Sequence, residues 1–285
     1  MIMKIFVLGP AGTNAHQAAL SAFEDAGKYI QFCATNGQVF DKVTQEGGYG
    51  ILPVENTTGG IVREVVDSWI DFEDNRPIVI GEVTLPISHY LLSHPTATSN
   101  LDCNAVASHP QALAQCRERL GKWGMFKTQI PTESTAAAAR DLANGGLPQT
   151  CSVLASKFAG NIYGLHIGDE LQDSRKNATR FHVIAHPENV TVPSDREGKN
   201  RTALIFFVDD KVGALAKALA SIDVDMSSIH SIPLRDGGYG FYVEFAAHGE
   251  SSAGIKILQR LETWTTKMTV LGCYSQAEMR KRRIE

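Results

Sequence analysis

The stretch Ile5-Phe6-Val7-Leu8-Gly9-Pro10-Ala11-Gly12-Thr13 indicates how the first half of the chain folds. Its four apolar residues are typical of a buried strand, and the Gly/Pro loop separates that strand from a helix expected to extend to about Ala26. The same strand–loop–helix unit recurs further along. The later units pair strand 50–54 with a helix through Val65, Val66 and Trp69, strand 105–107 with a helix starting at Pro110, and a strand ending at Ile130 with helix 136–139. This alternation predicts an α/β fold with a mainly parallel sheet.

The pattern changes after residue 186. Residues 187–199 contain Pro187, Pro193 and several charges, which is typical of a linker. Beyond it, the expected elements are strands 203–208, 226–232, 240–246 and 268–273, with helices 213–222 and 252–261. Their order is βαββαβ, the ferredoxin-like arrangement. We therefore expect a first domain over 1–186, a linker over 187–199, a second domain over 200–275 and a basic tail over 276–285.

Composition excludes several classes of protein. The 285 residues are 43% hydrophobic and 20% charged, which is sufficient for a packed core. The net charge of −4 does not favour nucleic-acid binding. Apolar runs are shorter than the roughly 20 residues that a membrane helix needs, and the N-terminus lacks a signal-peptide pattern. The five cysteines are dispersed and odd in number, which favours reduced thiols in a cytoplasmic protein. His182 and His186 lack a clear third ligand, so we expect no metal site.

Small polar residues recur where helices should begin. Each is most simply an N-cap that accepts a bond from the first helical N–H groups. Together they also indicate an anion site, because helix N-termini favour negative charge and ligands bind at the carboxyl ends of parallel strands. The segments are Thr13-Asn14, Asn56-Thr57-Thr58, Ser108-His109 and Thr132-Glu133-Ser134-Thr135. A small carboxylate ligand fits this pattern without a large cofactor.

The segment Asn177-Ala178-Thr179-Arg180-Phe181 combines a hydroxyl with a guanidinium. Thr179 could position a leaving hydroxyl and Arg180 could pair with a carboxylate. The simpler interpretation is a β-branched strand residue beside a surface charge. Familiar catalytic motifs do not decide between these interpretations, because the chain lacks a phosphate-binding P-loop and a Gly-x-Ser-x-Gly nucleophile elbow.

Five segments together make the chain resemble the prephenate dehydratase family. They occur in the family's order over roughly the first 186 residues, and the later region resembles the ACT regulatory domain that follows in that family. Its Gly213-Ala214-Leu215 matches a family segment. The five segments are 9–13, 52–57, 109–116, 134–139 and 177–181, which read GPAGT, LPVENT, HPQALAQC, STAAAA and NATRF.

The resemblance implies two lobes of the periplasmic-binding-protein type with an active site between them, followed by the ACT domain. It implies conversion of prephenate to phenylpyruvate without a cofactor, in phenylalanine biosynthesis, by a homodimer or homotetramer. Phenylalanine is the implied effector. Thr179 would be catalytic, assisting departure of the hydroxyl, while Phe181 packs beside it. The implied substrate-binding residues are Thr13, Asn56, Thr57, Ser134, Thr135 and Arg180, with Arg180 pairing with a carboxylate or organising the site; the implied effector-binding residues are Gly213, Ala214 and Leu215.

The sequence also departs from the family pattern. Asn14 and Ala15 replace an aromatic residue and a serine, and Thr57 replaces a serine. His230-Ser231-Ile232-Pro233 replaces Glu-Ser-Arg-Pro at the expected effector site, unless Arg235 or Asp236 takes over the charges. We therefore expect weakened control by phenylalanine. An arogenate dehydratase, a prephenate decarboxylase that does not aromatise its substrate, and a non-catalytic ligand sensor remain alternatives at this point.

Overall fold

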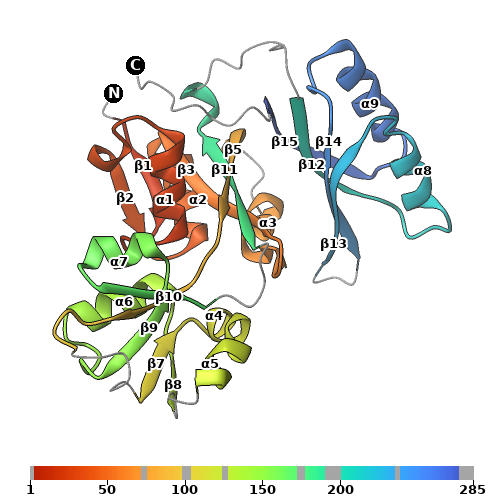
Figure 1. Ribbon diagram of the computed structural model, residues 1–285. Helices are drawn as coiled ribbons and strands as arrows, with labels where there is room; N and C mark the ends of the chain where they lie inside the picture. Colours follow the sequence, from red (N-terminus) through yellow and green to blue (C-terminus); the bar gives the residue numbers. More distant parts are fainter. Residues whose placement is uncertain are drawn as a thin grey trace.

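The computed structural model describes residues 3–71, 76–97, 104–123, 128–171, 177–189, 200–234 and 238–275. They form two α/β lobes and a C-terminal domain, drawn in Figure 1 in red to orange, yellow to green, and blue, with the green strand β11 returning to the first lobe. The predicted α/β fold class, with two lobes followed by a βαββαβ unit, is confirmed. Within the described residues, no helix is long and apolar enough to cross a membrane.

The first lobe is a mixed sheet with strand order β2-β1-β3-β11-β5 and β4 beside β3. β1 is parallel to β2 and β3, but β11 lies antiparallel between β3 and β5. The expectation of a mainly parallel sheet is therefore wrong, because the chain leaves this lobe through β5 and returns through β11 in the opposite direction. The strands are β1 (Ile5–Leu8), β2 (Ile30–Cys33), β3 (Tyr49–Asn56), β4 (Gly60–Ile61), β5 (Ile78–Pro86) and β11 (Ala178–Ala185).

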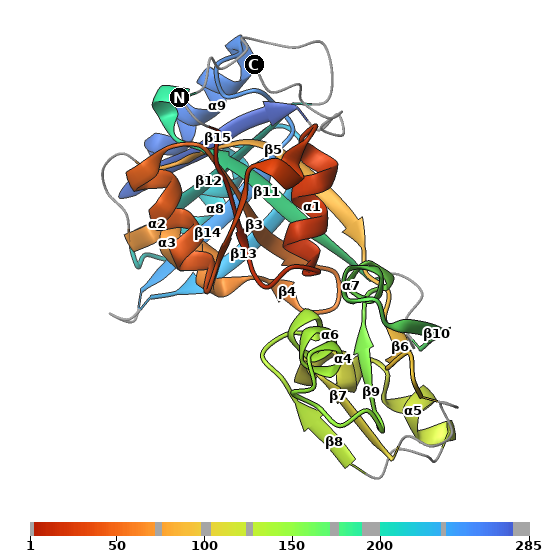
Figure 2. The same ribbon diagram turned by 90° about the vertical axis from the view of Figure 1, so that its left-hand side faces the viewer.

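Three helices cover this sheet, with α1 on one face and α2 and α3 on the other (Figure 2). The first helix is shorter than predicted. Phe23 turns to an extended backbone with its ring buried, and Asp25 adopts φ 53°, so the helix cannot continue to Ala26. The helices are α1 (Asn14–Ala22), the 3₁₀ turn η1 (Ala26–Lys28), α2 (Asn36–Glu46) and α3 (Arg63–Asp71).

The second lobe has strand order β10-β6-β9-β7-β8. The helix predicted from Pro110 is divided at Cys116, whose side chain is buried and whose backbone leaves helical geometry. That break places Gln115 at the end of its helix. The elements are β6 (Tyr90–Ser93), β7 (Ala105–Ser108), β8 (Thr128–Pro131), β9 (Cys151–Ala155), β10 (His166–Glu170), α4 (Pro110–Gln115), α5 (Arg117–Trp123), α6 (Thr135–Ala143) and α7 (Lys157–Tyr163).

Two chain segments connect the lobes, one from β5 to β6 and one from β10 to β11 (Figure 1). They are hydrogen-bonded near the crossing. Ile87 donates its N–H to the Asn177 carbonyl at 2.8 Å, and Leu171 donates to the His89 carbonyl at 2.8 Å. The two crossing segments therefore carry His89 and Asn177 at the junction of the lobes.

The C-terminal domain is a four-stranded antiparallel sheet in the order β13-β14-β12-β15, with two helices. The predicted domain boundaries remain predictions. Residues 187–189 form the 3₁₀ turn η3, and both the rest of the expected linker and the tail 276–285 lie outside the described residues. The elements are β12 (Asn200–Phe207), α8 (Ala214–Ala220), β13 (Met226–Pro233), β14 (Tyr239–Phe245), α9 (Ser252–Glu262) and β15 (Lys267–Ser275).

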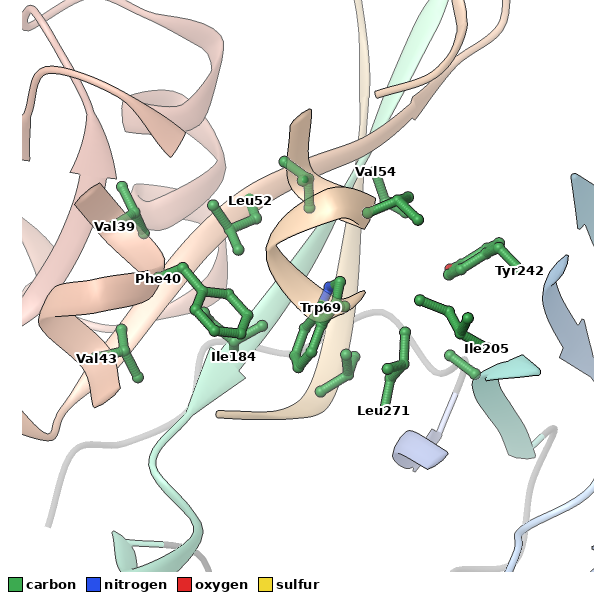
Figure 3. Packing of buried hydrophobic residues seen from close by; sticks show 14 of the residues in the cluster. Val39, Phe40, Val43, Leu52, Val54, Trp69, Ile184, Ile205, Tyr242 and Leu271 are labelled. Atoms are coloured by element: carbon green, nitrogen blue, oxygen red, sulfur yellow. The ribbon is translucent and has the colours of Figure 1, made fainter. Parts of the chain in front are cut away.

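The first lobe and the C-terminal domain share one apolar core (Figure 3). Trp69 lies between Phe40 of the same lobe and the C-terminal side chains Ile205 and Leu271. The backbones also approach closely: a Cβ atom on Gly272 would lie 2.1 Å from the Val79 carbonyl oxygen. Burying this much apolar surface favours a fixed arrangement of the C-terminal domain against the first lobe.

Candidate active site

Asn56 and Thr179 lie directly opposite each other in the β3–β11 pair. Asn56 Nδ2 donates a hydrogen bond to Thr179 Oγ1 at 2.9 Å. Thr179 is only 9% exposed, whereas the neighbouring Thr57 and Thr58 are open to solvent. The antiparallel return of β11 therefore brings together two residues separated by more than a hundred positions in the sequence.

The backbone fixes the orientation of the Asn56 amide. Asn56 Oδ1 accepts the N–H groups of Thr58 at 3.0 Å and Gly59 at 2.9 Å, and a backbone N–H can only donate. The amide nitrogen must therefore face Thr179. Because Thr179 Oγ1 already accepts this bond, the hydroxyl proton of Thr179 remains available, and it has no protein acceptor among the described residues.

Asn177 and Thr57 connect β11 to the loop after β3. Asn177 Oδ1 accepts from Asn56 Nδ2 at 2.8 Å, and Thr57 Oγ1 accepts the Ala178 N–H at 2.9 Å. Asn177 is 5% exposed. These bonds hold the two residues that precede Thr179 against the end of β3 and the loop that follows it.

Gln115 brings the second lobe into this group. From the end of α4 it donates through Nε2 to Thr58 Oγ1 at 2.7 Å, and its Oε1 accepts from Asn177 Nδ2 at 3.2 Å. His89 Nε2 lies 3.1 Å from the same Oε1 atom. Sequence reasoning assigned no role to Gln115, Asn177 or His89, although the first two lie inside motifs that it singled out.

The other predicted substrate contacts begin helices. Thr13 Oγ1 accepts the His16 N–H at 3.2 Å and donates to the Leu8 carbonyl at 2.7 Å, so both of its hydrogen-bonding roles are filled. Ser134 Oγ accepts the Ala137 N–H at 3.0 Å, and Thr135 is the first residue of α6. The structure thus unites Asn56, Thr57 and Thr179, while Thr13 and Ser134 cap α1 and α6.

The Arg180 side chain lies in a different environment from Thr179. Its guanidinium contacts three protein carboxylates, at 2.7 Å from Glu244, 2.9 Å from Glu55 and 3.3 Å from Glu82. Glu244 belongs to β14 of the C-terminal domain and is fully buried. Of the two roles that the resemblance implied for Arg180, this geometry favours the organising one, because the guanidinium is already neutralised by the protein.

A second arginine, Arg201, joins Arg180, Glu55, Glu82 and Glu244 to form an ion cluster between the first lobe and the C-terminal domain, here called the interdomain ion cluster. Arg201 Nη1 donates to Glu82 at 2.9 Å and to Glu244 at 3.1 Å. Burial alone would raise the pKa of Glu244, but the hydrogen bond from His182 and the positive charge of Arg180 lower it well below its usual range. Burial also lowers the pKa of His182, against the opposing effect of Glu244, so this fully buried imidazole is neutral. Glu244 is therefore an anion held at the domain interface.

The residues expected to bind the effector lie in two places. Residues 213–215 lie at the start of α8, apart from the interdomain ion cluster, whereas His230 and Ile232 lie at the interface with the first lobe. Gly213 has φ 81° and precedes α8, a backbone conformation that favours glycine, and Ala214 and Leu215 begin the helix. His230 Nε2 faces Glu55 at 3.5 Å, and Ile232 is buried in the shared core. Arg235 and Asp236, the alternative sources of charge, lie outside the described residues.

Comparisons with known proteins agree with this architecture. The family model for prephenate dehydratase matches residues 5–189. The chain belongs to the prephenate dehydratase family. It is 35% identical to the bifunctional chorismate mutase/prephenate dehydratase of Aquifex aeolicus, covering 96% of this chain and 74% of that protein. It is 30% identical to the prephenate dehydratase of Bacillus subtilis, covering 97% of this chain and 100% of that protein.

A solved structure of the family also matches nearly the whole fold. It is the prephenate dehydratase of Arthrobacter aurescens in complex with L-Phe, at TM-score 0.86 and 24% identity, covering 99% of this chain and 93% of that one. At this identity the likeness concerns the fold. It extends over the C-terminal domain, so the two lobes and the βαββαβ unit together are a family arrangement.

Proposed function

We propose that this prephenate dehydratase converts prephenate to phenylpyruvate at the Asn56–Thr179 pair. The reaction breaks the bond to the ring carboxylate, whose electron pair enters the ring, and expels the ring hydroxyl as water after one proton is taken up. The products are phenylpyruvate, carbon dioxide and water. Aromatisation supplies a large driving force, so the enzyme's task is to orient prephenate and assist the departing hydroxyl.

Thr179 is the proposed catalytic residue, and the observation that carries this proposal is the direction of the Asn56–Thr179 hydrogen bond. Since Thr179 Oγ1 accepts from Asn56, its own O–H remains available to donate a hydrogen bond to a ligand. A threonine hydroxyl is a very weak acid, so its role is to donate a hydrogen bond to the leaving oxygen. That bond strengthens as the oxygen gains negative charge in the transition state.

Residues around Thr179 would hold the polar groups of prephenate. Thr57 is an exposed residue beside Thr179, and Ser134 and Thr135 of the second lobe stand at the N-terminus of α6, where the helix dipole favours a carboxylate. Arg180 acts through position. It follows Thr179 directly in β11, and its guanidinium binds Glu244 of the C-terminal domain.

The C-terminal domain is proposed to be an ACT regulatory domain with phenylalanine as its effector. Its βαββαβ order and the Gly213 turn support this assignment. We also propose a homodimer or homotetramer in the cytoplasm, in keeping with the dispersed cysteines. Size-exclusion chromatography with light scattering tests the oligomeric state.

Incubation of the purified protein with prephenate tests the function directly. Equal amounts of phenylpyruvate and carbon dioxide are expected. Carbon dioxide without an aromatic product would identify a decarboxylase, and no turnover would favour a ligand sensor. Arogenate in a parallel assay, compared by kcat/KM, decides which of the two substrates the site prefers.

A further inference from the structure

His89 lies on the β5–β6 crossing and is 6% exposed. Its Nε2 atom is 3.1 Å from Gln115 Oε1, the amide oxygen that reaches the Asn56–Thr179 group from the second lobe. A hydrogen bond at this distance requires that one of the two atoms carry a proton, and an amide oxygen carries none. The protonation of His89 is therefore decided by the orientation of the Gln115 amide.

The hydrogen bonds around Gln115 fix that orientation, step by step. Backbone N–H groups make Asn56 Oδ1 an acceptor, so Asn56 Nδ2 donates to Asn177 Oδ1 at 2.8 Å. The opposite atom of the Asn177 amide, Nδ2, then donates to Gln115 at 3.2 Å. The Gln115 atom that receives this bond must be the oxygen, and its Nε2 therefore faces Thr58 at 2.7 Å.

His89 Nε2 must consequently carry a proton and donate it to Gln115 Oε1. Burial lowers the pKa of His89, against the opposing effect of the Gln115 bond, so the ring is neutral and its Nδ1 atom holds a lone pair. Nδ1 is buried and has no hydrogen-bond partner among the described residues. An imidazole with one buried nitrogen bonded and the other unpaired is costly to retain for packing alone.

We propose that His89 is a positioning residue for the dehydration: its Nε2–H fixes the Gln115 amide so that Gln115 spans the two lobes and orients Thr58 and Asn56. The bonds then run in one direction, from His89 through Gln115 to Thr58, whose hydroxyl donates to Asn56 Oδ1 at 2.7 Å. Asn56 in turn donates to Thr179. This inference rests on the proposed function of Thr179.

Loss of the His89 donor should loosen the Gln115 amide without emptying the space. His89→Phe keeps a planar ring but cannot donate, and should lower kcat about tenfold with KM changed less than twofold, the scale of one lost hydrogen bond. His89→Gln places an amide N–H near the former Nε2 and should recover most of this loss. His166→Phe, an exposed substitution on β10 of the same lobe, is the matched control.

A merely structural role of His89 makes a different prediction. If the ring only fills space, His89→Phe should retain kcat, and His89→Gln should be the worse variant. Coupling to Gln115 provides a second criterion. In a Gln115→Ala background the His89→Phe change should have almost no further effect on kcat, whereas independent losses that multiply would overturn the proposal.

A spectroscopic readout keeps this inference separate from the reaction. Nitrogen-15 spectra of the histidine rings at pH 7 should assign the Nε2–H tautomer to the signal that disappears in His89→Gln. A protonated Nδ1 at this position would overturn the proposal even in a protein that melts normally. Failure of the wild-type protein to turn over prephenate would instead refute the proposed function, and the tautomer measurement would still decide the placement of the proton.

Discussion

Thr179 and Arg180 are consecutive residues of β11 whose side chains lie on opposite sides of the strand and bond to different parts of the protein. Thr179 Oγ1 accepts from Asn56 at the junction of the two lobes, at 2.9 Å, while Arg180 Nη1 donates to Glu244 of the C-terminal domain at 2.7 Å. Opposite orientation follows from the alternation of side chains along a strand. The β3–β11 register also shifts between Arg180 and Phe181, next to this pair. One peptide unit thus connects the candidate catalytic hydroxyl to the interdomain ion cluster.

Replacing Thr179 should affect turnover far more than folding. Thr179→Ala removes the donor to the leaving oxygen and should lower kcat about 10²–10⁴-fold, the usual scale for losing positioned proton or hydrogen-bond assistance. Thr179→Ser keeps the hydroxyl and should retain much of the activity. Thr84→Ala, an exposed threonine on the neighbouring β5, controls for loss of a β-branched residue. Near-normal turnover in folded Thr179→Ala would remove Thr179 from the mechanism.

Alanine substitutions at the helix starts should separate capping from substrate binding. Thr13→Ala should cost about 0.5–2 kcal/mol of stability with kinetics spared, because both bonds of its hydroxyl are made within the protein. Ser134→Ala should also raise KM, because capping uses only the acceptor role of its hydroxyl. Asn56→Ala should lower kcat. Melting curves and steady-state kinetics, measured in parallel, separate capping from substrate binding. A raised KM or a lowered kcat in Thr13→Ala, measured where the variant is fully folded, would restore Thr13 as a substrate contact.

Glu244 should couple the C-terminal domain to the catalytic strand. Glu244→Gln leaves Arg180 and Arg201 with less negative charge around them, and breaking a buried ion pair of this kind typically costs about 3–5 kcal/mol. We expect a large loss of stability together with reduced kcat. Combining it with Arg180→Met tests the coupling, because the double variant should lose much less than the sum of the single losses. Additive losses would show that Arg180 and Glu244 do not act as a pair.

Sequence patterns predicted the elements more completely in the C-terminal domain than in the lobes, for a physical reason. Residues 200–275 form a simple antiparallel sheet whose strands and helices follow one another locally, and each expected element was found there. In the lobes, β11 returns to the first sheet only after the whole second lobe, so the register that pairs Thr179 with Asn56 is long-range. The contact of Gln115 with Thr58 likewise depends on how the two lobes meet. Local periodicity carries no information on either pairing.

The environment of Arg180 illustrates the same limit at the level of one side chain. A guanidinium beside a candidate catalytic threonine predicts either a carboxylate of the substrate as its partner or a role in organising the site. The carboxylates it contacts come from β3, β5 and β14 instead. Glu244 is a single charged residue within the apolar strand Tyr239–Phe245, and only the docking of the C-terminal domain brings it to Arg180.

Stability should fall as the pH decreases below about 6.5, the unperturbed pKa of histidine. Burial lowers the pKa of His182, so the unfolded chain takes up a proton that the folded protein does not. The contribution is fully present above pH 6.5 and is lost as the pH falls, by at most about 1.4 kcal/mol per pH unit for one group. Burial lowers the pKa values of His16 and His89 as well, which adds to the slope with the same sign.

Urea unfolding at several pH values between 5 and 7.5 measures this slope. His182→Gln cannot take up the proton and should give a shallower pH dependence, whatever its absolute stability. The exposed His166→Gln is the control and should leave the slope unchanged. A slope that is the same in His182→Gln and in the wild type would show that His182 is not held neutral in the folded protein.

Phenylalanine should inhibit this enzyme weakly. The effector carries an ammonium and a carboxylate, but His230 already faces Glu55 and Ile232 is 1% exposed in the shared core. Neither residue supplies the charges expected at the effector site, so the difference in affinity between active and inactive states should shrink, and an effector shifts the equilibrium only by that difference. We expect saturating phenylalanine to change kcat/KM less than about fivefold, the lower end of typical allosteric coupling.

Titration of phenylalanine into the prephenate assay measures this coupling. Gly213→Ala strains the turn at φ 81° and should abolish the residual response; Gly145→Ala, at φ 79° and equally open to solvent, should leave it unchanged. Strong inhibition at low phenylalanine would mean that other charged groups replace those missing at His230 and Ile232. Loss of that strong inhibition in Gly213→Ala but not in Gly145→Ala would still place the effector at the start of α8, because the two substitutions impose the same backbone strain and differ only in location.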